Sequence, residues 1–389
     1  MILKASAALA LSNTPANRFS VDLFCRVIDN FGDAGVCLRL ARALVLHHDC
    51  SVRLFCDDVA LLVRLEPTPP MGLQFCSWQA QQHATPAQGV VCGFGCTLEA
   101  QYLAKLASAQ PQPAYLHLDY LSAEPWVETT HGHWMLHPRL ATHQRFCNPG
   151  FNERTGGLLH EPAAYSQALA LATLSQWGST VPADALRVFV FAYLTDCFKA
   201  FVRAAALAMQ PIHWVLPQGV AGQQVWLALQ GRAQHSFTRL PFVSQTQFDA
   251  ALRSCQRAWV RGEDSAITAL FAGVPMVWQL YPQDDGAHRV KTQAYIDTVE
   301  RAVGHTDPLA FARWRGALCA ANGVPLPTAI PEALATQGAQ VWFDFLNPSA
   351  AQPQLQAQAL AQAWALHCAA RSPDLGLTVS SWLKNWTIH

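Results

Sequence analysis

Two short polar stretches of the 389-residue sequence carry residue types that could act on a substrate. The first, Cys25–Cys37, reads CRVIDNFGDAGVC and places two carboxylates, Asp29 and Asp33, among glycines. The second reads RGEDS at residues 261–265 and puts an arginine before two acids and a hydroxyl. Paired carboxylates can hold a cation or accept a proton, whereas an arginine beside a helix start can hold a phosphate.

The residues that flank the first stretch predict a strand, a tight turn and a helix. Val21–Val27 is largely apolar and β-prone, and apolar residues recur at helical spacing from Val36 to Leu44. Glycine-rich turns of this kind often hold a phosphate, so the charges of Asp29 and Asp33 indicate a different ligand, a cation. The alternative is an Asx turn followed by an ordinary helix N-cap.

The second stretch lies between an apolar strand that ends at Val260 and a short helix over Ala266–Ala272. Asp264 or Ser265 is expected to be the N-cap of this helix. Its free backbone N–H groups could bind an anion, and Arg261 could add a two-pronged phosphate contact. The alternative is a capped turn with a surface ion pair.

Three further loops in the second half of the chain favour a nucleotide ligand. FVFAY at residues 189–193 and LPFVSQ at 240–245 offer aromatic surface for a base, and YPQDDGAH at 281–288 adds hydrogen-bond acceptors. Together with RGEDS they would suit a nucleoside diphosphate sugar. The base would stack on the aromatic rings, the diphosphate would bind the helix start, and Glu263 would bind ribose or sugar hydroxyls.

Strands that alternate with helical patterns in both halves predict an α/β protein with two parallel sheets. The expected strands are residues 21–27, 52–56, 73–76, 89–92, 114–118, 186–193, 213–217, 257–262 and 275–280. We expect an N-terminal domain at residues 1–178, of which 1–18 form a loose extension, and a C-terminal domain at 179–370. Residues 371–389 are expected to pack back on the first domain.

Composition excludes several classes of function. The 26 basic and 26 acidic residues balance, which leaves no basic surface for nucleic acid. The 12 cysteines form no C-x-x-C pair, which is typical of a reducing cytosol. Ala5–Leu11 is a poor signal sequence, and no apolar run reaches the ~20 residues of a membrane span. A cytoplasmic monomer without membrane contact is expected. His131, His133 and His137 lack a neighbouring carboxylate in a segment expected to be a loop, so no metal site is predicted.

The motifs FCRVIDNFGDAGVCLRLARAL, LDYLSAEPWVE, LPFVSQTQFD, VRGEDS and YPQDDGAHRVK together resemble the EarP family. The resemblance runs from residue 21 to residue 294, and its members are protein-arginine rhamnosyltransferases that modify translation elongation factor P. It implies a GT-B architecture, in which two Rossmann-like domains face an interdomain cleft. It also implies an inverting reaction from dTDP-β-L-rhamnose to an arginine side chain of elongation factor P. If Arg261 and the helix start stabilise the charge on the leaving diphosphate, the reaction needs no metal or cofactor.

The resemblance implies roles for particular residues. Asp29 and Asp33 match the acidic positions of the acceptor side and the chemical step. Phe31 and Gly32 beside them are also expected to contact the acceptor. Tyr120, Ser122 and Glu124 are expected to do so because they follow a strand of the first half. The residues expected to bind dTDP-rhamnose are Phe191, Tyr193, Phe242, Gln245, Arg261, Gly262, Glu263, Asp264 and Ser265. Cys92 stands where the family commonly has a glutamate, so its loop is assigned no role.

An arginine acceptor explains the two carboxylates of the first stretch. A guanidinium titrates above ~12 and an aspartate near ~4, so the carboxylates would first hold the cation and accept its proton late. We expect Asp33 to be the base, because the helix dipole favours its ionised form, and Asp29 to orient the guanidinium. Gly32 and Gly35 are expected to leave room for the acceptor.

Two other functions remain open from the sequence. A GT-B enzyme with another nucleotide sugar and a small-molecule or glycolipid acceptor would share the donor half, but it would not need paired carboxylates that face a cation. A catalytically silent module that binds a translation factor would not need to keep Asp29, Asp33 and Glu263. For Tyr120, Ser122 and Glu124 the alternative is a helix start capped by Ser122.

Overall fold

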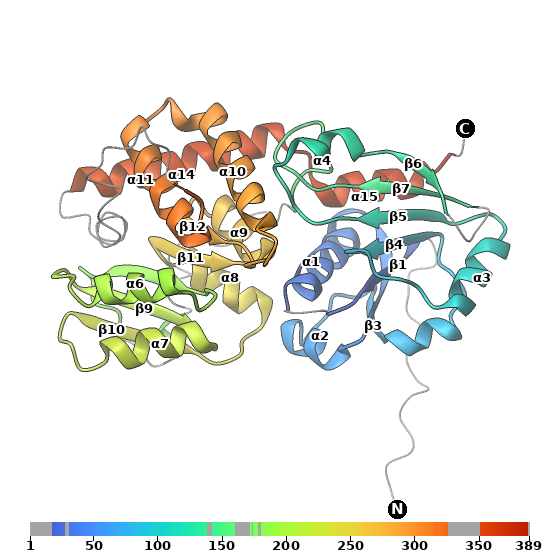
Figure 1. Cartoon of the computed structure of the whole chain (residues 1–389). Helices are drawn as coiled ribbons and strands as arrows, with labels where there is room; N and C mark the ends of the chain where they lie inside the picture. The colour runs from blue at the N-terminus through green and yellow to red at the C-terminus, as the bar shows by residue number, and fades with distance from the viewer. Residues whose placement is uncertain are drawn as a thin grey trace, which may run out of the picture.

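A computed structural model describes residues 18–27, 31–137, 142–159, 172, 174–177, 180–325 and 351–387. The chain forms two α/β domains that lie side by side, each built on its own sheet (Figure 1). The expected extension at residues 1–18 lies, except for Arg18, outside the described residues. Within the described ranges, no helix is both long enough and apolar enough to cross a bilayer.

The sheet of the first domain has seven strands in the order β3-β2-β1-β4-β5-β7-β6. All neighbours pair in parallel except β6 and β7, which are antiparallel. The strands are β1 (Phe19–Cys25), β2 (Cys50–Cys56), β3 (Leu73–Ser77), β4 (Gly89–Gly93), β5 (Ala114–Leu118), β6 (Trp134–Leu136) and β7 (His143–Cys147). The helices are α1 (Gly32–His47), α2 (Val59–Leu65), α3 (Ala100–Ser108) and α4 (Pro125–Thr130), with a 3-10 helix at Trp78–Gln82.

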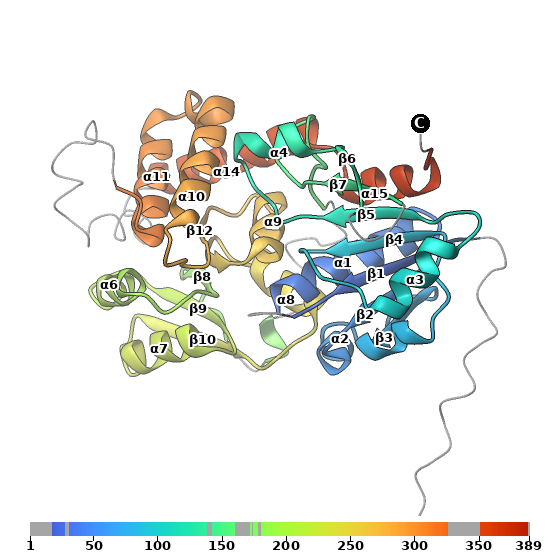
Figure 2. The same cartoon turned by 45° about the vertical axis from the view of Figure 1, so that its right-hand side comes forward.

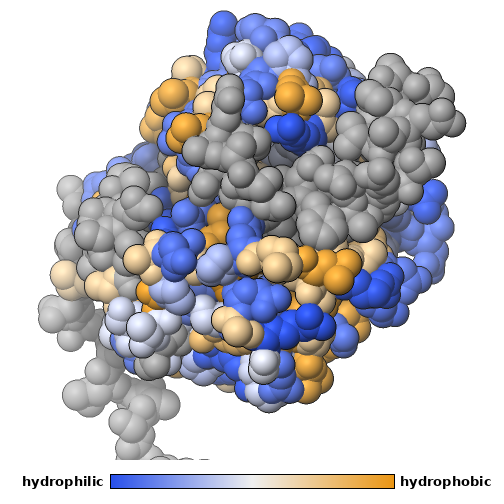
Figure 3. Space-filling model, turned by 90° about the vertical axis from the view of Figure 1, so that its left-hand side faces the viewer, coloured by the Kyte–Doolittle hydropathy of each residue, from blue (hydrophilic) through white to orange (hydrophobic). Residues whose placement is uncertain are grey.

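The sheet of the second domain has five parallel strands in the order β10-β9-β8-β11-β12. The strands are β8 (Leu186–Val190), β9 (Ile212–Pro217), β10 (His235–Leu240), β11 (Arg257–Arg261) and β12 (Met276–Gln279). The helices are α6 (Asp196–Ala205), α7 (Val220–Leu229), α8 (Gln245–Arg253), α9 (Glu263–Phe271), α10 (Ala287–Val299) with a π-helical turn at Glu300–Gly304, α11 (Pro308–Asn322) and α14 (Ala351–Arg371). On the outer face of this domain, hydrophilic and hydrophobic residues are interspersed (Figure 3).

The strand order of each sheet fixes where a ligand can bind. In both sheets the chain winds outward from the first strand and then returns to its other side, so the order reverses between β1 and β4 and between β8 and β11. Loops beyond the carboxyl ends of strands at such a reversal form the usual ligand site of open α/β sheets. The loops after β1 and β11 contain the two polar stretches singled out in the sequence.

Three strands were not predicted from the sequence, and β8 ends earlier than expected. The segment around His131–His137 was expected to be a loop, but its centre forms the edge strand β6, whose three side chains are all exposed. β7 (HQRFC) and β10 (HSFTRL) were not predicted either, because both are rich in polar residues and contain no apolar run. The strand expected at residues 186–193 ends at Val190, which leaves Phe191 and Tyr193 in the loop beyond its carboxyl end.

A buried carboxylate ties the first sheet together. Asp22 in β1 is fully buried, and its oxygens accept hydrogen bonds from the Arg53 guanidinium at 2.6 and 2.8 Å. They also accept bonds from the Tyr102 hydroxyl and from the backbone N–H of Ala87. Because every partner is present, the charge is compatible with the interior, and it joins β1, β2 and α3 in one network.

The final helix, α15 (Leu375–Lys384), returns to the first domain and packs on α1, β4 and β5 (Figures 1 and 2). Leu375, Val379 and Leu383 are buried in the core of that domain. Leu383 lies over Gly89 of β4 so closely that a Cβ at this glycine would come within 2.9 Å of it. The end of the chain is therefore part of the first domain's core.

The packing of α15 predicts the effect of two leucine substitutions. Leu383→Ala should lower the free energy of unfolding by about 2–5 kcal/mol, because it leaves a cavity over Gly89. Leu377→Ala on the same helix should change it by less than about 0.5 kcal/mol, since Leu377 is 57% exposed. Urea unfolding followed by circular dichroism measures both, and equal losses in the two variants would contradict the packing described.

Candidate active site

Asp33 lies in the first turn of α1, where the helix dipole favours a carboxylate. The Tyr120 hydroxyl, from the loop after β5, donates a hydrogen bond to Asp33 Oδ2 at 3.4 Å. Burial and the Asp33 charge raise the pKa of Tyr120, so this hydroxyl keeps its proton and remains a donor. The other predicted acceptor carboxylate, Asp29, lies outside the described residues.

Tyr120 is held in place by Phe94, which the sequence did not single out. The two rings stack with centroids 4.6 Å apart. Phe94 follows β4 in the GFG turn and has a φ of 55°, a left-handed conformation that is costly for an aromatic residue. The loops after β1, β4 and β5 therefore converge on the Asp33 carboxylate.

The other predicted acceptor residues are arranged unequally around Asp33. Phe31 is 51% exposed beside Asp33, and a Cβ on Gly32 would meet open space. Ser122 and Glu124 instead contact each other, because the Ser122 hydroxyl donates to the Glu124 carboxylate at 2.9 Å. Glu124, not Ser122, is the N-cap residue of α4, and it makes no side-chain capping bond.

On the second domain, three predicted donor residues form one cluster beyond β8 and β11. The Arg261 guanidinium lies 4.6 Å from the ring centroids of both Phe191 and Tyr193. Cation–π contact of this kind holds the side chain in place without neutralising its charge. The cluster thus presents aromatic rings and a positive charge at the carboxyl ends of adjacent strands, the combination that a nucleoside diphosphate needs.

Helix α9 begins earlier than the sequence indicated. Its N-cap is Gly262, so the prediction of Asp264 or Ser265 as the cap is wrong. Gly262 has a φ of 74°, and a Cβ there would meet open space. The Ser265 hydroxyl donates to the carbonyl of Arg261 instead of capping the helix. The first N–H groups of α9 therefore have no side-chain cap, and the space beside the cap residue is open.

Asp264 faces the first domain. Its carboxylate accepts hydrogen bonds from Arg39 of α1, at 2.5 Å from Nε and 3.1 Å from Nη2. The same guanidinium donates to Asp249 of α8 at 2.9 and 3.1 Å. Arg39 is therefore a fork between two carboxylates of the other domain, at the place where Figures 1 and 2 show α8 and α9 facing α1.

Gln245 belongs to the same interdomain contact. Its side-chain amide is buried and donates to Asp264 Oδ2 and to the carbonyl of Gly35 in α1, both at 2.9 Å. A Cβ on Gly35 would lie 3.5 Å from each of these two side chains. Gly35 was expected to leave room for an acceptor, but it lies where α1 meets the second domain.

Glu263 also reaches the first domain, and its environment favours the protonated acid. Burial raises the pKa of Glu263 to about 8, and the charges of Asp33 and Asp119 act in the same direction. A hydrogen bond with the Leu121 backbone and the charge of Lys291 oppose this rise. At neutral pH the acid is therefore largely uncharged, which lowers the negative charge at the start of α9.

Phe242, the second predicted base-stacking residue, contacts the first domain. The Arg64 guanidinium of α2 lies 3.6 Å from its ring centroid, and Phe31 meets it edge to face at 6.0 Å. Phe242 therefore lies where the second domain meets α2 and the residue before α1. Arg64 is exposed, so a nucleotide base that stacks on Phe242 would have to displace its guanidinium or stack on the other face of the ring.

The histidine segment has other uses than metal binding. The His131 ring stacks on Trp382 of α15, and its Nδ1 accepts from the backbone N–H of Asn148. Over the residues that the structure describes, no three His, Cys, Asp or Glu side chains come together as metal ligands would.

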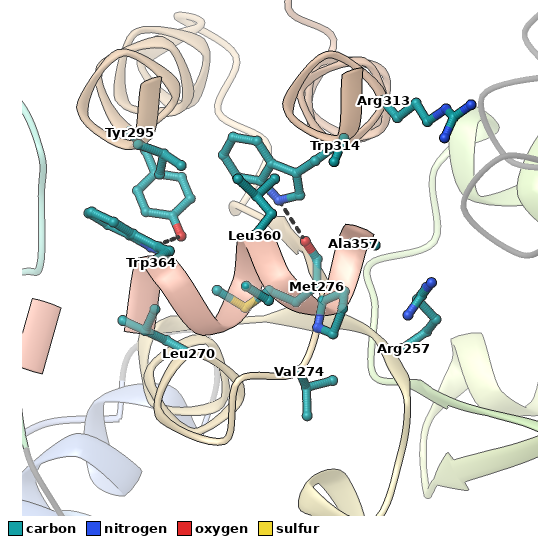
Figure 4. A pocket seen from close by; sticks show the side chains of 14 residues that line it. Arg257, Leu270, Val274, Met276, Tyr295, Arg313, Trp314, Ala357, Leu360 and Trp364 are labelled. Carbon is teal, nitrogen blue, oxygen red and sulfur yellow. Dashed lines mark hydrogen bonds between the residues drawn. The ribbon is translucent and has the colours of Figure 1, made fainter. Parts of the chain in front are cut away.

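A cavity in the second domain lies away from these residues (Figure 4). Arg257 and Met276, at the amino ends of β11 and β12, line it together with aromatic residues of α10, α11 and α14. Two of these aromatics are fixed by hydrogen bonds, Trp364 to the Tyr295 hydroxyl and Trp314 to the Met276 carbonyl. The cavity is at the opposite edge of the sheet from the polar loops, so we do not include it in the site.

Three residues of this region, Arg39, Phe94 and Lys291, were not predicted from the sequence. Arg39 stands among apolar residues on the buried face of α1, and a cation at such a position needs a partner. Lys291 of α10 places its Nζ 5.7 Å from the Tyr120 ring centroid. The YPQDDGAHRVK motif contains Lys291, but nothing in its local pattern indicates a contact with the other domain.

Comparison with known proteins identifies relatives over almost the whole chain. Residues 21–383 match the model of the family described as elongation factor P (EF-P) rhamnosyltransferase EarP. A protein-arginine rhamnosyltransferase of Pseudomonas putida is 37% identical over 306 residues, which cover 71% of this chain and 80% of that protein. One from Shewanella oneidensis is 31% identical, with coverage of 73% and 82%.

A solved structure supports the same relationship. It is described as the structural basis for EarP-mediated arginine glycosylation of translation elongation factor EF-P. It is 28% identical, has a TM-score of 0.61, and covers 95% of this chain and 99% of its own. The predicted fold class, α/β with two Rossmann-like domains of the GT-B type, is therefore confirmed.

The raised pKa of Glu263 predicts a pH-dependent stability. The pKa of Glu263 is about 8 in the folded protein and 4.5 in the unfolded chain. The free energy of unfolding should therefore fall as pH rises between these two values and level off above pH 8. Glu263→Gln should lack this contribution and gain in melting temperature over the wild type as pH rises from 5 to 9. Glu153→Gln, at an exposed residue, is the control. Parallel curves for wild type and Glu263→Gln would contradict the burial of the acid.

Proposed function

Because the chain belongs to the EarP family of EF-P rhamnosyltransferases, we propose that it transfers L-rhamnose from dTDP-β-L-rhamnose to an arginine side chain of translation elongation factor P. The observation that carries this proposal is the pairing of two unlike half-sites. Asp33 and Tyr120 form the acidic half-site on the first domain. Arg261 and the aromatic rings beside it form the basic half-site on the second domain. The acidic half-site suits a guanidinium, and the basic half-site suits a nucleotide.

The two half-sites meet at the domain boundary. Glu263 is two residues from Arg261, and its pKa responds to the charge of Asp33. Lys291 of the second domain lies over Tyr120 of the first. A donor at Arg261 and an acceptor at Asp33 would therefore be neighbours, as transfer between them requires.

On the acceptor side, Asp33 would hold the guanidinium and then take its proton. A nitrogen of the acceptor arginine attacks the anomeric carbon while the bond from that carbon to the diphosphate oxygen breaks. The electron pair leaves with dTDP, and the nitrogen's proton passes to the Asp33 carboxylate. A single displacement of this kind inverts the anomeric centre, so a β-linked donor gives an α-linked product. We assign Asp29 the role of orienting the guanidinium.

On the donor side, Arg261 and the uncapped N–H groups of α9 would stabilise the charge that develops on the leaving diphosphate. The base would stack on Phe191, Tyr193 or Phe242. In this scheme these groups of the protein provide the positive charge that a divalent metal supplies in other transferases, so we propose a reaction that needs no metal.

Incubation of the full chain with dTDP-β-L-rhamnose and EF-P, followed by intact-mass spectrometry, tests the proposal. We expect one added deoxyhexose on EF-P, no addition when the acceptor arginine is replaced by lysine, and full activity in excess EDTA. An unmodified EF-P would contradict the function. Activity that EDTA abolishes and Mg²⁺ restores would contradict only the metal-free scheme.

Asp33→Asn tests the chemical step. Asparagine keeps the size and hydrogen bonding of the side chain but cannot accept a proton, so turnover should fall on the order of 100-fold or more. dTDP binding and the melting temperature should stay near wild type. Asp49→Asn, at an exposed residue of the same domain, should leave turnover unchanged. Turnover of Asp33→Asn within a few-fold of wild type would mean that another group takes the proton.

A further inference from the structure

Arg39 is a buried charge that belongs to one domain and whose described carboxylate partners belong to the other. It is 3% exposed in α1, and its guanidinium joins Asp249 and Asp264 through four hydrogen bonds of 2.5–3.1 Å. Arg42, one turn further along α1, instead pairs with Glu66 of its own domain at 3.1 Å. The charge of Arg42 also acts on Asp264 and lowers its pKa, but the Arg39 guanidinium has the larger effect.

The position of Asp264 makes the Arg39 contact relevant to the donor. Asp264 lies in the first turn of α9, directly after Glu263. Two carboxylates at a helix start cancel the attraction that its dipole exerts on an anion. Glu263 is largely protonated at neutral pH, so Asp264 is the charge that remains. The Arg39 guanidinium neutralises it and keeps the pKa of Asp264 below its usual range.

We propose that Arg39 is a positioning residue of the donor site. It holds the start of α9 against α1 and cancels the Asp264 charge, so that this helix end can receive the donor diphosphate opposite Asp33. The proposal rests on the proposed function, because it takes the nucleotide at Arg261 as given. It also gives Asp264 and Gln245 an indirect role: Gln245 bonds to the Gly35 carbonyl and to Asp264, so the two side chains shape the site without touching the donor.

Calorimetry with dTDP on the full chain tests this role. Arg39→Gln leaves the Asp264 charge uncompensated beside the diphosphate, so the dissociation constant should rise on the order of tenfold or more. Arg39→Gln combined with Asp264→Asn removes both charges and should recover most of that loss. Arg53→Gln breaks an ion pair with Asp22 inside the first domain and should change the constant less than twofold. Melting temperatures separate binding from stability, since both arginine variants should be less stable.

Asp264→Asn alone keeps the test decisive if Arg39→Gln does not fold. It removes the charge that Arg39 cancels, so dTDP should bind at least as well as to the wild type. Weaker binding would mean that Asp264 touches the donor directly, and it would overturn the proposal. Unchanged affinity in Arg39→Gln, or no recovery in the double variant, would overturn it as well. A wild type that does not bind dTDP would refute the donor itself, and with it this role of Arg39.

Discussion

The fork of Arg39 between Asp249 and Asp264 is the contact on which the arrangement of the two domains depends. A buried guanidinium must keep its carboxylates close, because separating them would leave unpaired charge in the interior. Since α1 starts at Gly32 and α9 starts at Glu263, this contact also fixes the distance between the two helix ends that follow β1 and β11. The reversal points of both sheets are thereby turned toward each other.

The side chains around the two helix starts favour ligands of opposite charge, a cation at α1 and an anion at α9. The start of α1 places the Asp33 carboxyl group beside the Tyr120 hydroxyl, an acidic position that suits a cation. The end of α9 carries two acids, but burial protonates one and Arg39 neutralises the other. Arg261, held on its aromatic rings, then leaves this side positive. Two helix starts with the same dipole thus acquire opposite preferences through the side chains around them.

The sequence predicted most of the parallel strands and the polar loops, because apolar runs and turn residues act locally. The prediction failed where backbone geometry, or contacts between residues far apart in the sequence, determine the structure. Gly262 could cap α9 through its left-handed backbone, which no side-chain pattern records. β6 exposes all three of its side chains and owes its existence to pairing with β7. The partners of Arg39 are 210 and 225 residues away, so only the folded chain shows that Asp264 contacts α1.

Because α15 packs in the first domain, that domain cannot complete its core when its own residues have been synthesised. A ribosome releases the first domain long before the second, and domains generally fold in that order as they emerge. Leu375, Val379 and Leu383 nevertheless belong to the core of the first domain. Its surface over α1, β4 and β5 therefore stays uncovered until α15 is made. A chain interrupted anywhere in the second domain exposes apolar surface in the first, which marks unfinished copies for chaperones or proteases.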